Sequence, residues 1–172
     1  SGGIEFGQNP AVLSRLIREV RRATSLPLLV KLSPNVTDIA EMARVCEGEG
    51  ADGISAITTL QALVIDVETR RPSLSNGLGG RSGPAIRPGA LRMVWQCVRA
   101  VDIPVCGVGG ICSAEDAIQF LLCGASAVQV GTANFLTPMA AAEVAEGIEG
   151  YCSRHGVERV SDLVGGVAFP GL

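Results

Sequence analysis

Two segments of this sequence follow the same order of elements, and this repetition constrains the fold more than any other feature. In each segment a proline precedes an apolar run of strand length, and a loop, a helix pattern, a Gly-Ala pair and a second apolar run follow. The prolines are Pro27 and Pro104, and the pairs are Gly50-Ala51 and Gly124-Ala125. The repeat predicts two βαβ units. Near-continuous apolar strands that alternate with helices predict an α/β fold with a parallel, helix-covered sheet.

The number of strands limits the size of that sheet. The four apolar runs are LLVKLS, ADGISAIT, Ile103 to Gly107 and SAVQVGT. A closed (β/α)8 TIM barrel has eight strands and roughly 250 residues, whereas this chain has 172. We therefore predict one domain over residues 1–172 that forms about half of such a barrel. Because aromatic residues make up only 3% of the chain, its core must consist of Val, Leu, Ile and Ala.

Local signals predict the helices and one irregular segment. The stretch from Asn9 to Thr24 has an apolar stripe with arginines opposite, which indicates an amphipathic helix. Asp38 and Ser113 each stand where a helix N-cap is expected. About 30 residues separate the strand that ends near Ile57 from a helix that begins near Arg87, and connections of this length are usually functional or disordered. Within this segment, VIDV and PSLS are expected to pair as a small hairpin.

Composition argues against several functional classes. The net charge is −3 and the 14 basic residues form no long run, so we expect no nucleic-acid binding. The apolar runs are too short for a membrane span, and the N-terminal SGGIEFGQNP lacks the pattern of a signal peptide. The cysteines form no CxxC motif, which argues against a metal site or a disulfide framework. We interpret them as mostly buried thiols of a cytoplasmic protein, namely Cys46, Cys97, Cys106, Cys112, Cys123 and Cys152.

Glycines follow the last two strands of the chain, where parallel α/β proteins bind their ligands. Gly109-Gly110 ends one strand and Gly131-Thr132 ends the next. Glycine amides can approach phosphate oxygens closely, and the Thr132 hydroxyl adds a donor. These two loops predict a phosphate site. The alternative is that the glycines only allow tight turns between strand and helix.

Polar side chains follow the first two strands. Lys31 interrupts an apolar strand, and we interpret it as a buried cation beside a ring or carbonyl that becomes negative during a reaction. A strand-end lysine that points to solvent, or a Schiff-base lysine of a lyase, is an alternative. Thr58, Thr59 and Asn35 are candidate hydrogen-bonding groups for a small polar ligand. No base lies near Cys112 in sequence, which argues against a nucleophilic role for this thiol.

Several motifs together resemble one family. VKLSPNVTDI, ADGISAI, SGPAIRP, PVCGVGGI and GASAVQVGTANF resemble the C-terminal half of the (β/α)8 barrel of dihydroorotate dehydrogenases, and they match the NAD-linked class 1B catalytic subunit best. The resemblance implies FMN-dependent oxidation of dihydroorotate to orotate in pyrimidine biosynthesis. It also implies a homodimer of the full-length subunit and an electron-transfer subunit with FAD and a 2Fe–2S cluster. The FMN contacts that it implies are Lys31, Ile57, Gly83, Gly109, Gly110, Gly131 and Thr132, and the substrate contacts are Thr58 and Thr59.

The chain departs from the family pattern at three points. Thr58-Thr59 stands where the family usually has Asn-Thr, and Arg81 stands where an apolar residue is usual. The resemblance also implies a cysteine base upstream of residue 1, so we expect no catalytic residue in this chain and expect the chain to be truncated at its N-terminus. Two alternatives stay open: a dihydropyrimidine dehydrogenase domain with the same barrel, and a noncatalytic half-barrel that binds phosphate.

Overall fold

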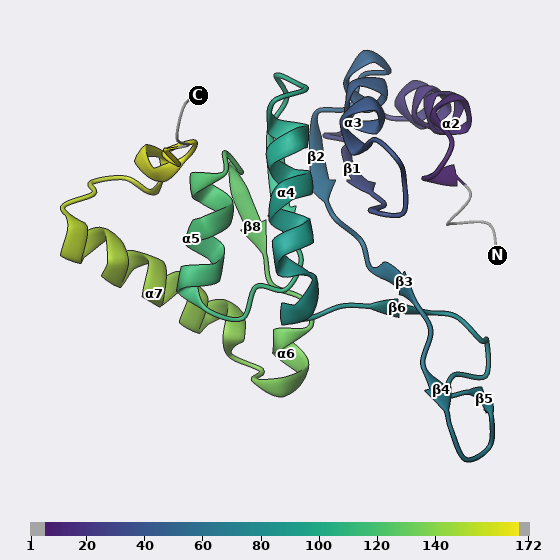
Figure 1. Ribbon diagram of the computed structural model, residues 1–172. Helices are drawn as coiled ribbons and strands as arrows, with labels where there is room; N and C mark the ends of the chain where they lie inside the picture. The colour runs from purple at the N-terminus through teal and green to yellow at the C-terminus, as the bar shows by residue number, and fades with distance from the viewer. Residues whose placement is uncertain (1–5, 169–172) are drawn as a thin grey trace.

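A four-stranded parallel sheet forms the centre of the computed structural model, which describes residues 6–168. The SGG start, on which the signal-peptide and truncation expectations depend, lies outside the described residues. The strand order is β1-β2-β7-β8, so the two repeat units lie side by side (Figure 1). The strands are β1 (Leu29–Leu32), β2 (Gly53–Ala56), β7 (Val105–Val108) and β8 (Ala127–Gln129). This arrangement confirms the predicted α/β class and matches part of a TIM barrel.

Helices cover one face of this sheet. α3 (Ile39–Gly48) packs on β1 and β2, α4 (Arg87–Val98) on β2 and β7, and α5 (Ala114–Leu122) on β8. α2 (Pro10–Ala23) packs on α3, and α7 (Ala140–His155) packs on α5. The sequence had not indicated α7 or the short α6 (Ala133–Leu136). Two 3-10 turns, Pro84–Ile86 and Val160–Leu163, complete the helical elements of the described residues.

Side chains cap the starts of three helices, and the caps predicted at Asp38 and Ser113 are confirmed. Asn9 accepts hydrogen bonds from two backbone N–H groups at the start of α2, at 3.0 and 3.2 Å. Asp38 does the same at the start of α3. Ser113 and Asp116 form a reciprocal capping box at the start of α5. Each cap satisfies donors that a helix leaves unpaired, so these short polar residues fix where the helices begin.

The two faces of the sheet differ in burial. Leu32, Ile54 and Val105 are at most 2% exposed because they face the helices. On the opposite face, Leu29 is 52% exposed and Lys31 is exposed as well. The predicted burial of Lys31 is therefore wrong for this chain, because no element of the described residues covers that face of β1.

The strand predicted from Ile103 to Gly107 instead runs from Val105 to Val108. Pro104 has no N–H to donate, so the ladder of amide hydrogen bonds starts after it. Only its carbonyl joins the sheet, where it accepts the Ile54 N–H at 2.9 Å. The shift brings Val108 to the carboxyl edge, directly before the glycines.

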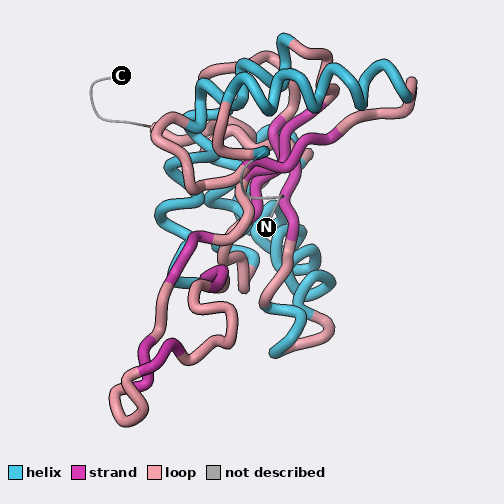
Figure 2. The backbone as a smooth tube through the Cα atoms, turned by 90° about the vertical axis from the view of Figure 1, so that its right-hand side faces the viewer, coloured by secondary structure: helices cyan, strands magenta, loops and turns pink. Residues whose placement is uncertain are grey.

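The long connection forms an arm that projects from the body (Figures 1 and 2). β3 (Leu60–Ala62) pairs with β6 (Gly79–Arg81), and β4 (Ile65–Asp66) pairs with β5 (Arg71–Pro72). The predicted hairpin exists, but its second strand is Arg71–Pro72 rather than PSLS, because the Asp66 side chain accepts the Glu68 and Thr69 N–H groups and closes the turn early. Arg81 is exposed in β6, and nothing in the structure explains its charge.

None of the helices within residues 6–168 is long and apolar enough to cross a bilayer. The six cysteines all lie within residues 6–168, and all of them are free thiols. Cys46, Cys97 and Cys152 are buried as predicted, whereas Cys112 is exposed.

Candidate functional site

A cavity of about 250 Å³ lies at the carboxyl ends of the four strands. The loops that follow β1, β2, β7 and β8, together with the segment before α4, form its wall. All nine residues that the sequence analysis assigned to cofactor or substrate binding line it, namely Lys31, Ile57, Thr58, Thr59, Gly83, Gly109, Gly110, Gly131 and Thr132. The fold therefore brings together residues that are up to 101 positions apart in the chain, from 31 to 132.

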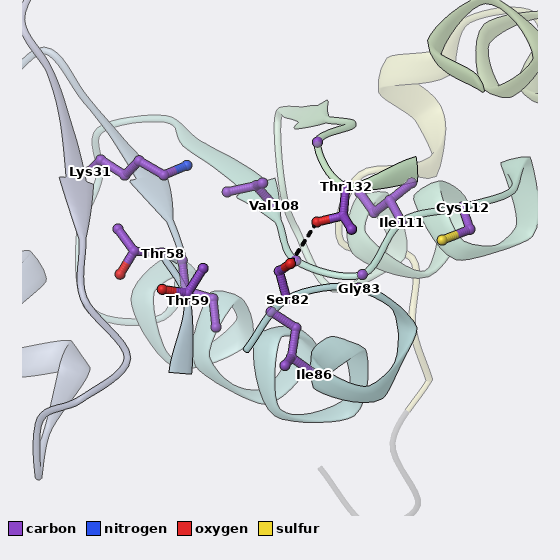
Figure 3. A pocket seen from close by; sticks show the side chains of 14 residues that line it. Lys31, Thr58, Thr59, Ser82, Gly83, Ile86, Val108, Ile111, Cys112 and Thr132 are labelled. Carbon is purple, nitrogen blue, oxygen red and sulfur yellow. Dashed lines mark hydrogen bonds between the residues drawn. The ribbon is translucent and has the colours of Figure 1, made fainter. Parts of the chain in front are cut away.

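Lys31 forms the polar part of the wall on the β1 side. Its Nζ lies 3.5 Å from the Ser55 Oγ, and that hydroxyl in turn donates to the Gln129 Oε1 at 3.1 Å. Desolvation lowers the pKa of Lys31, and the neighbouring Cys106 opposes this shift. Figure 3 shows the Lys31 side chain extended toward Val108, above Thr58 and Thr59. The cation thus lies over the cavity, although its residue is exposed.

The loop after β7 supplies backbone rather than side chains. Gly109 and Gly110 both have positive φ, at 141° and 79°. A Cβ on Gly109 would lie 2.7 Å from the Ala90 Cβ, and one on Gly110 would lie 2.7 Å from the Gly83 carbonyl oxygen. These two positions need glycine for conformation and for close packing. The alternative interpretation, a tight turn, therefore accounts for both glycines without a ligand.

Gly131 differs from these two glycines. It has no positive φ, and a Cβ built there would meet nothing within 4 Å. Protein packing therefore gives no reason for glycine at this position, which lines the cavity. The neighbouring Thr132 hydroxyl donates to the Ser82 Oγ at 2.8 Å, and both oxygens lie at the cavity wall opposite Lys31 (Figure 3).

A second hollow of about 420 Å³ adjoins the first through Lys31, Thr58 and Thr59, which line both. Asn35 lies in its wall, where its amide donates to the Thr59 carbonyl at 3.1 Å and accepts the Gln61 N–H at 2.9 Å. Asn35 therefore fixes the backbone after β2. Its two amide atoms are already engaged by the protein.

Besides Cys112, four cavity residues were not assigned to binding from the sequence. Ile86, Val108 and Ile111 form apolar wall, and Ser82 adds the hydroxyl that Thr132 contacts. Ser82 and Ile86 lie in the quoted SGPAIRP motif, so the motif itself was the available signal. Asn134, which follows β8, does not line either hollow and instead donates to the Val130 carbonyl at 2.9 Å.

Cys112 and His155 are not placed together for nucleophilic catalysis in the part of the chain that the structure describes. Cys112 lines the cavity, but His155 lies in α7 and stacks on Tyr151 with ring centroids 4.0 Å apart. Groups of three or more His, Cys, Asp or Glu that could hold a metal ion do not occur within residues 6–168.

The cavity walls fit a phosphorylated, partly apolar cofactor such as FMN. Open space beside Gly131 and two hydroxyls suit an anion, and the wall of Ile57, Val108 and Ile111 suits a planar ring. Lys31 lies where it can face that ring. Gly110, which has a positive φ, lines the same wall.

Comparisons with known proteins identify the family of this chain. The family model for dihydroorotate dehydrogenase matches residues 1–151. Dihydroorotate dehydrogenase B (NAD(+)) catalytic subunits from Pelobacter propionicus and Trichlorobacter lovleyi are 58% and 57% identical to this chain over 164 residues. These residues make up 95% of this chain and 54% of each relative, so the chain spans about half the length of the curated relatives it matches. The chain belongs to the dihydroorotate dehydrogenase family.

Proposed function

We propose that this chain is the FMN-binding part of a dihydroorotate dehydrogenase catalytic subunit. The whole subunit would oxidise dihydroorotate to orotate in pyrimidine biosynthesis, and residues 1–172 would form one domain of half-barrel architecture within it. The observation that carries the proposal is Gly131, where a wall of the cavity lacks a side chain although packing would allow one. A ligand in contact with the backbone explains this position, and a tight turn does not.

In this proposal, different walls of the cavity bind different parts of FMN. Gly131, Thr132 and Gly110 bind the phosphate through backbone N–H groups and one hydroxyl. Ile57 and Gly83 contact the flavin through backbone, and neighbouring apolar side chains exclude water from it. FMN, when bound, supplies the acceptor for a hydride from the substrate. Lys31 holds a positive charge beside the ring and stabilises the negative charge that arrives there.

Thr58 and Thr59 are the proposed substrate contacts, because they line both the first cavity and the second hollow beside Lys31. A hydroxyl can donate to a carbonyl of the pyrimidine and accept from its N–H. It is shorter than the asparagine amide that the family pattern has at Thr58, so substrate affinity depends on Thr59 as well. We assign no residue of this chain to proton abstraction.

The partners follow from the relatives. Curated relatives are named catalytic subunits of an NAD(+)-linked enzyme, a name that implies a separate electron-transfer subunit. We propose that the whole protein acts in the cytoplasm as a homodimer with such a subunit, which carries FAD and a 2Fe–2S cluster.

Flavin titration tests this function. The purified chain is mixed with FMN, and quenching of flavin fluorescence is followed, with riboflavin as the matched ligand that lacks the phosphate. Saturable quenching at one FMN per chain, with weaker binding of riboflavin, supports the proposal. Addition of orotate to the FMN-loaded chain should then shift the visible flavin band.

Three other outcomes would contradict the proposal. Binding of inorganic phosphate, measured by calorimetry, without any flavin quenching would indicate a noncatalytic phosphate site. A band shift with uracil but not with orotate would indicate a dihydropyrimidine dehydrogenase domain. Absence of binding by both flavins would reject the FMN site in this chain.

A further inference from the structure

The carboxylate of Asp116 joins three segments around the cavity. Asp116 is 7% exposed and lies in the first turn of α5. Its Oδ2 accepts the backbone N–H groups of Cys112 and Ser113 at 2.9 and 3.2 Å. Its Oδ1 forms an ion pair with Arg87, the first residue of α4. The capping of α5 uses Oδ2 alone, so the ion pair is an additional connection between two helices.

The loop after β7 and the segment before α4 also meet at Gly110. A Cβ on Gly110 would lie 2.7 Å from the Gly83 carbonyl oxygen and 2.9 Å from the Arg87 Cβ. The loop after β7 is thus in close contact with the segment before α4. The hydrogen bond between Thr132 and Ser82 connects the loop after β8 to that same segment. Three cavity loops therefore form one connected wall, with Arg87 at its outer side.

Neither member of the ion pair lines the cavity. Arg87 is nevertheless four residues from Gly83, close to the proposed anion site. Its guanidinium charge is directed to Asp116 rather than into the cavity. Recognition of an anion is then left to backbone N–H groups and hydroxyls, whose usefulness depends on a fixed orientation.

We infer that Arg87 and Asp116 are positioning residues that hold the Gly109–Ser113 loop against the Gly83–Arg87 segment and thereby preform the phosphate cradle. The pair determines how strongly the site prefers a phosphorylated flavin to an unphosphorylated one. The identity of this ligand rests on the proposed function. The fixed loop does not, because all its contacts are between residues of this chain.

The test compares Arg87→Gln with Arg87→Lys and with Arg159→Gln. Arg87→Lys keeps the charge, and Arg159→Gln removes an exposed ion pair with Asp162 far from this loop in sequence. Amide hydrogen exchange is measured first on the ligand-free proteins. We expect Arg87→Gln to accelerate exchange in residues 109–113 by about tenfold, because an ion pair to a buried carboxylate is lost. Exchange in β2 should not change, and Arg87→Lys should restore part of the protection.

Flavin affinity is the second readout. Arg87→Gln should weaken FMN binding by about tenfold and riboflavin binding by less than about twofold. Arg159→Gln should change neither. Equal weakening of both flavins, or uniformly faster exchange through the sheet, would overturn the inference and leave the pair a purely structural role. Wild-type protein that binds neither flavin would reject the proposed function, while the exchange data would still decide whether the pair fixes the loop.

Discussion

The two βαβ units of this chain have the same plan but present different chemistry to the cavity. In each unit a capped helix follows the first strand, and two residues after the helix comes a glycine with positive φ, Gly50 at 88° and Gly124 at 105°. A buried alanine comes next, Ala51 or Ala125. After their strands, however, the first unit presents side chains and the second presents glycine backbone. The two units therefore share one backbone plan, and a few loop residues after the strands determine which chemical groups each unit presents to a ligand.

This difference divides the cavity into two halves. Lys31, Thr58 and Thr59 of the first unit offer a charge and hydroxyls that suit the polar edge of a ring. Gly110, Gly131 and Thr132 of the second unit suit an anion. Substitutions in each unit should accordingly separate effects on folding, on phosphate recognition and on ring recognition.

Gly110→Val should have the largest effect and should affect folding as well as binding. The new Cβ would lie 2.7 Å from the Gly83 carbonyl oxygen, at a φ of 79°. Overpacking and strain together should cost about 3 kcal/mol of unfolding free energy. Urea denaturation measures this loss, with Gly77→Val as the control, since Gly77 has a similar φ of 77° but no neighbour within 4 Å. Equal losses in both variants would show that the contact with Gly83 is unimportant.

Gly131→Val should instead leave folding intact and weaken phosphate recognition. Because a Cβ there meets nothing within 4 Å, the unfolding free energy should change by less than about 0.5 kcal/mol. The valine side chain would occupy the proposed phosphate space, so FMN affinity should fall by at least about tenfold, while riboflavin affinity stays nearly constant. Fluorescence titrations with both flavins check this. A parallel loss for riboflavin would contradict the division of the cavity.

Lys31→Met should affect the ring half. Removal of the positive charge should lower the two-electron midpoint potential of bound FMN by about 30 mV, because the reduced flavin carries more negative charge. Stability should change little, since Lys31 is exposed. Lys31 is the only lysine of the chain, so protection of its amine from acylation by bound flavin gives a second readout. An unchanged potential together with an unprotected amine would remove Lys31 from the site.

Glu49→Gln should have the smallest effect and none on binding. Glu49 is the C-cap of α3 in the first unit, where hydrogen bonds from Arg18 and Ser14 lower its pKa from 4.5 to about 2. A depressed carboxyl pKa stabilises the folded state above pH 4.5, and this contribution is lost between pH 4.5 and about 2. Denaturation of both proteins across this range should show their stability difference disappear with falling pH. A difference that persists at the acidic end would contradict this role of the Glu49 charge.

Sequence reasoning succeeded where the signal was local. The strands around Ile54 and Val105 were recognisable as apolar runs, and the caps at Asp38 and Ser113 act on N–H groups only a few residues away. The glycine loops could be assigned because strand ends meet at one edge of a parallel sheet.

Features that depend on distant segments could not be predicted. β3 pairs with β6 through a Gly-Gly-Arg sequence that has no strand pattern. The exposure of Lys31 depends on which elements cover the inner face of β1, and no residue near Lys31 carries that information. Arg87 and Asp116 are 29 positions apart, and neither sequence neighbourhood predicts their ion pair. The distinct reasons for glycine at positions 110 and 131 also become visible only when neighbours in space are known.

Amide NMR of the 17.7 kDa chain, titrated separately with inorganic phosphate, riboflavin and FMN, tests the division of the cavity most directly. Phosphate should shift the resonances of Gly110, Gly131 and Thr132, riboflavin those of Lys31 and Thr58, and FMN both groups. Phosphate-induced shifts confined to the first unit, or FMN-induced shifts in neither unit, would contradict the account.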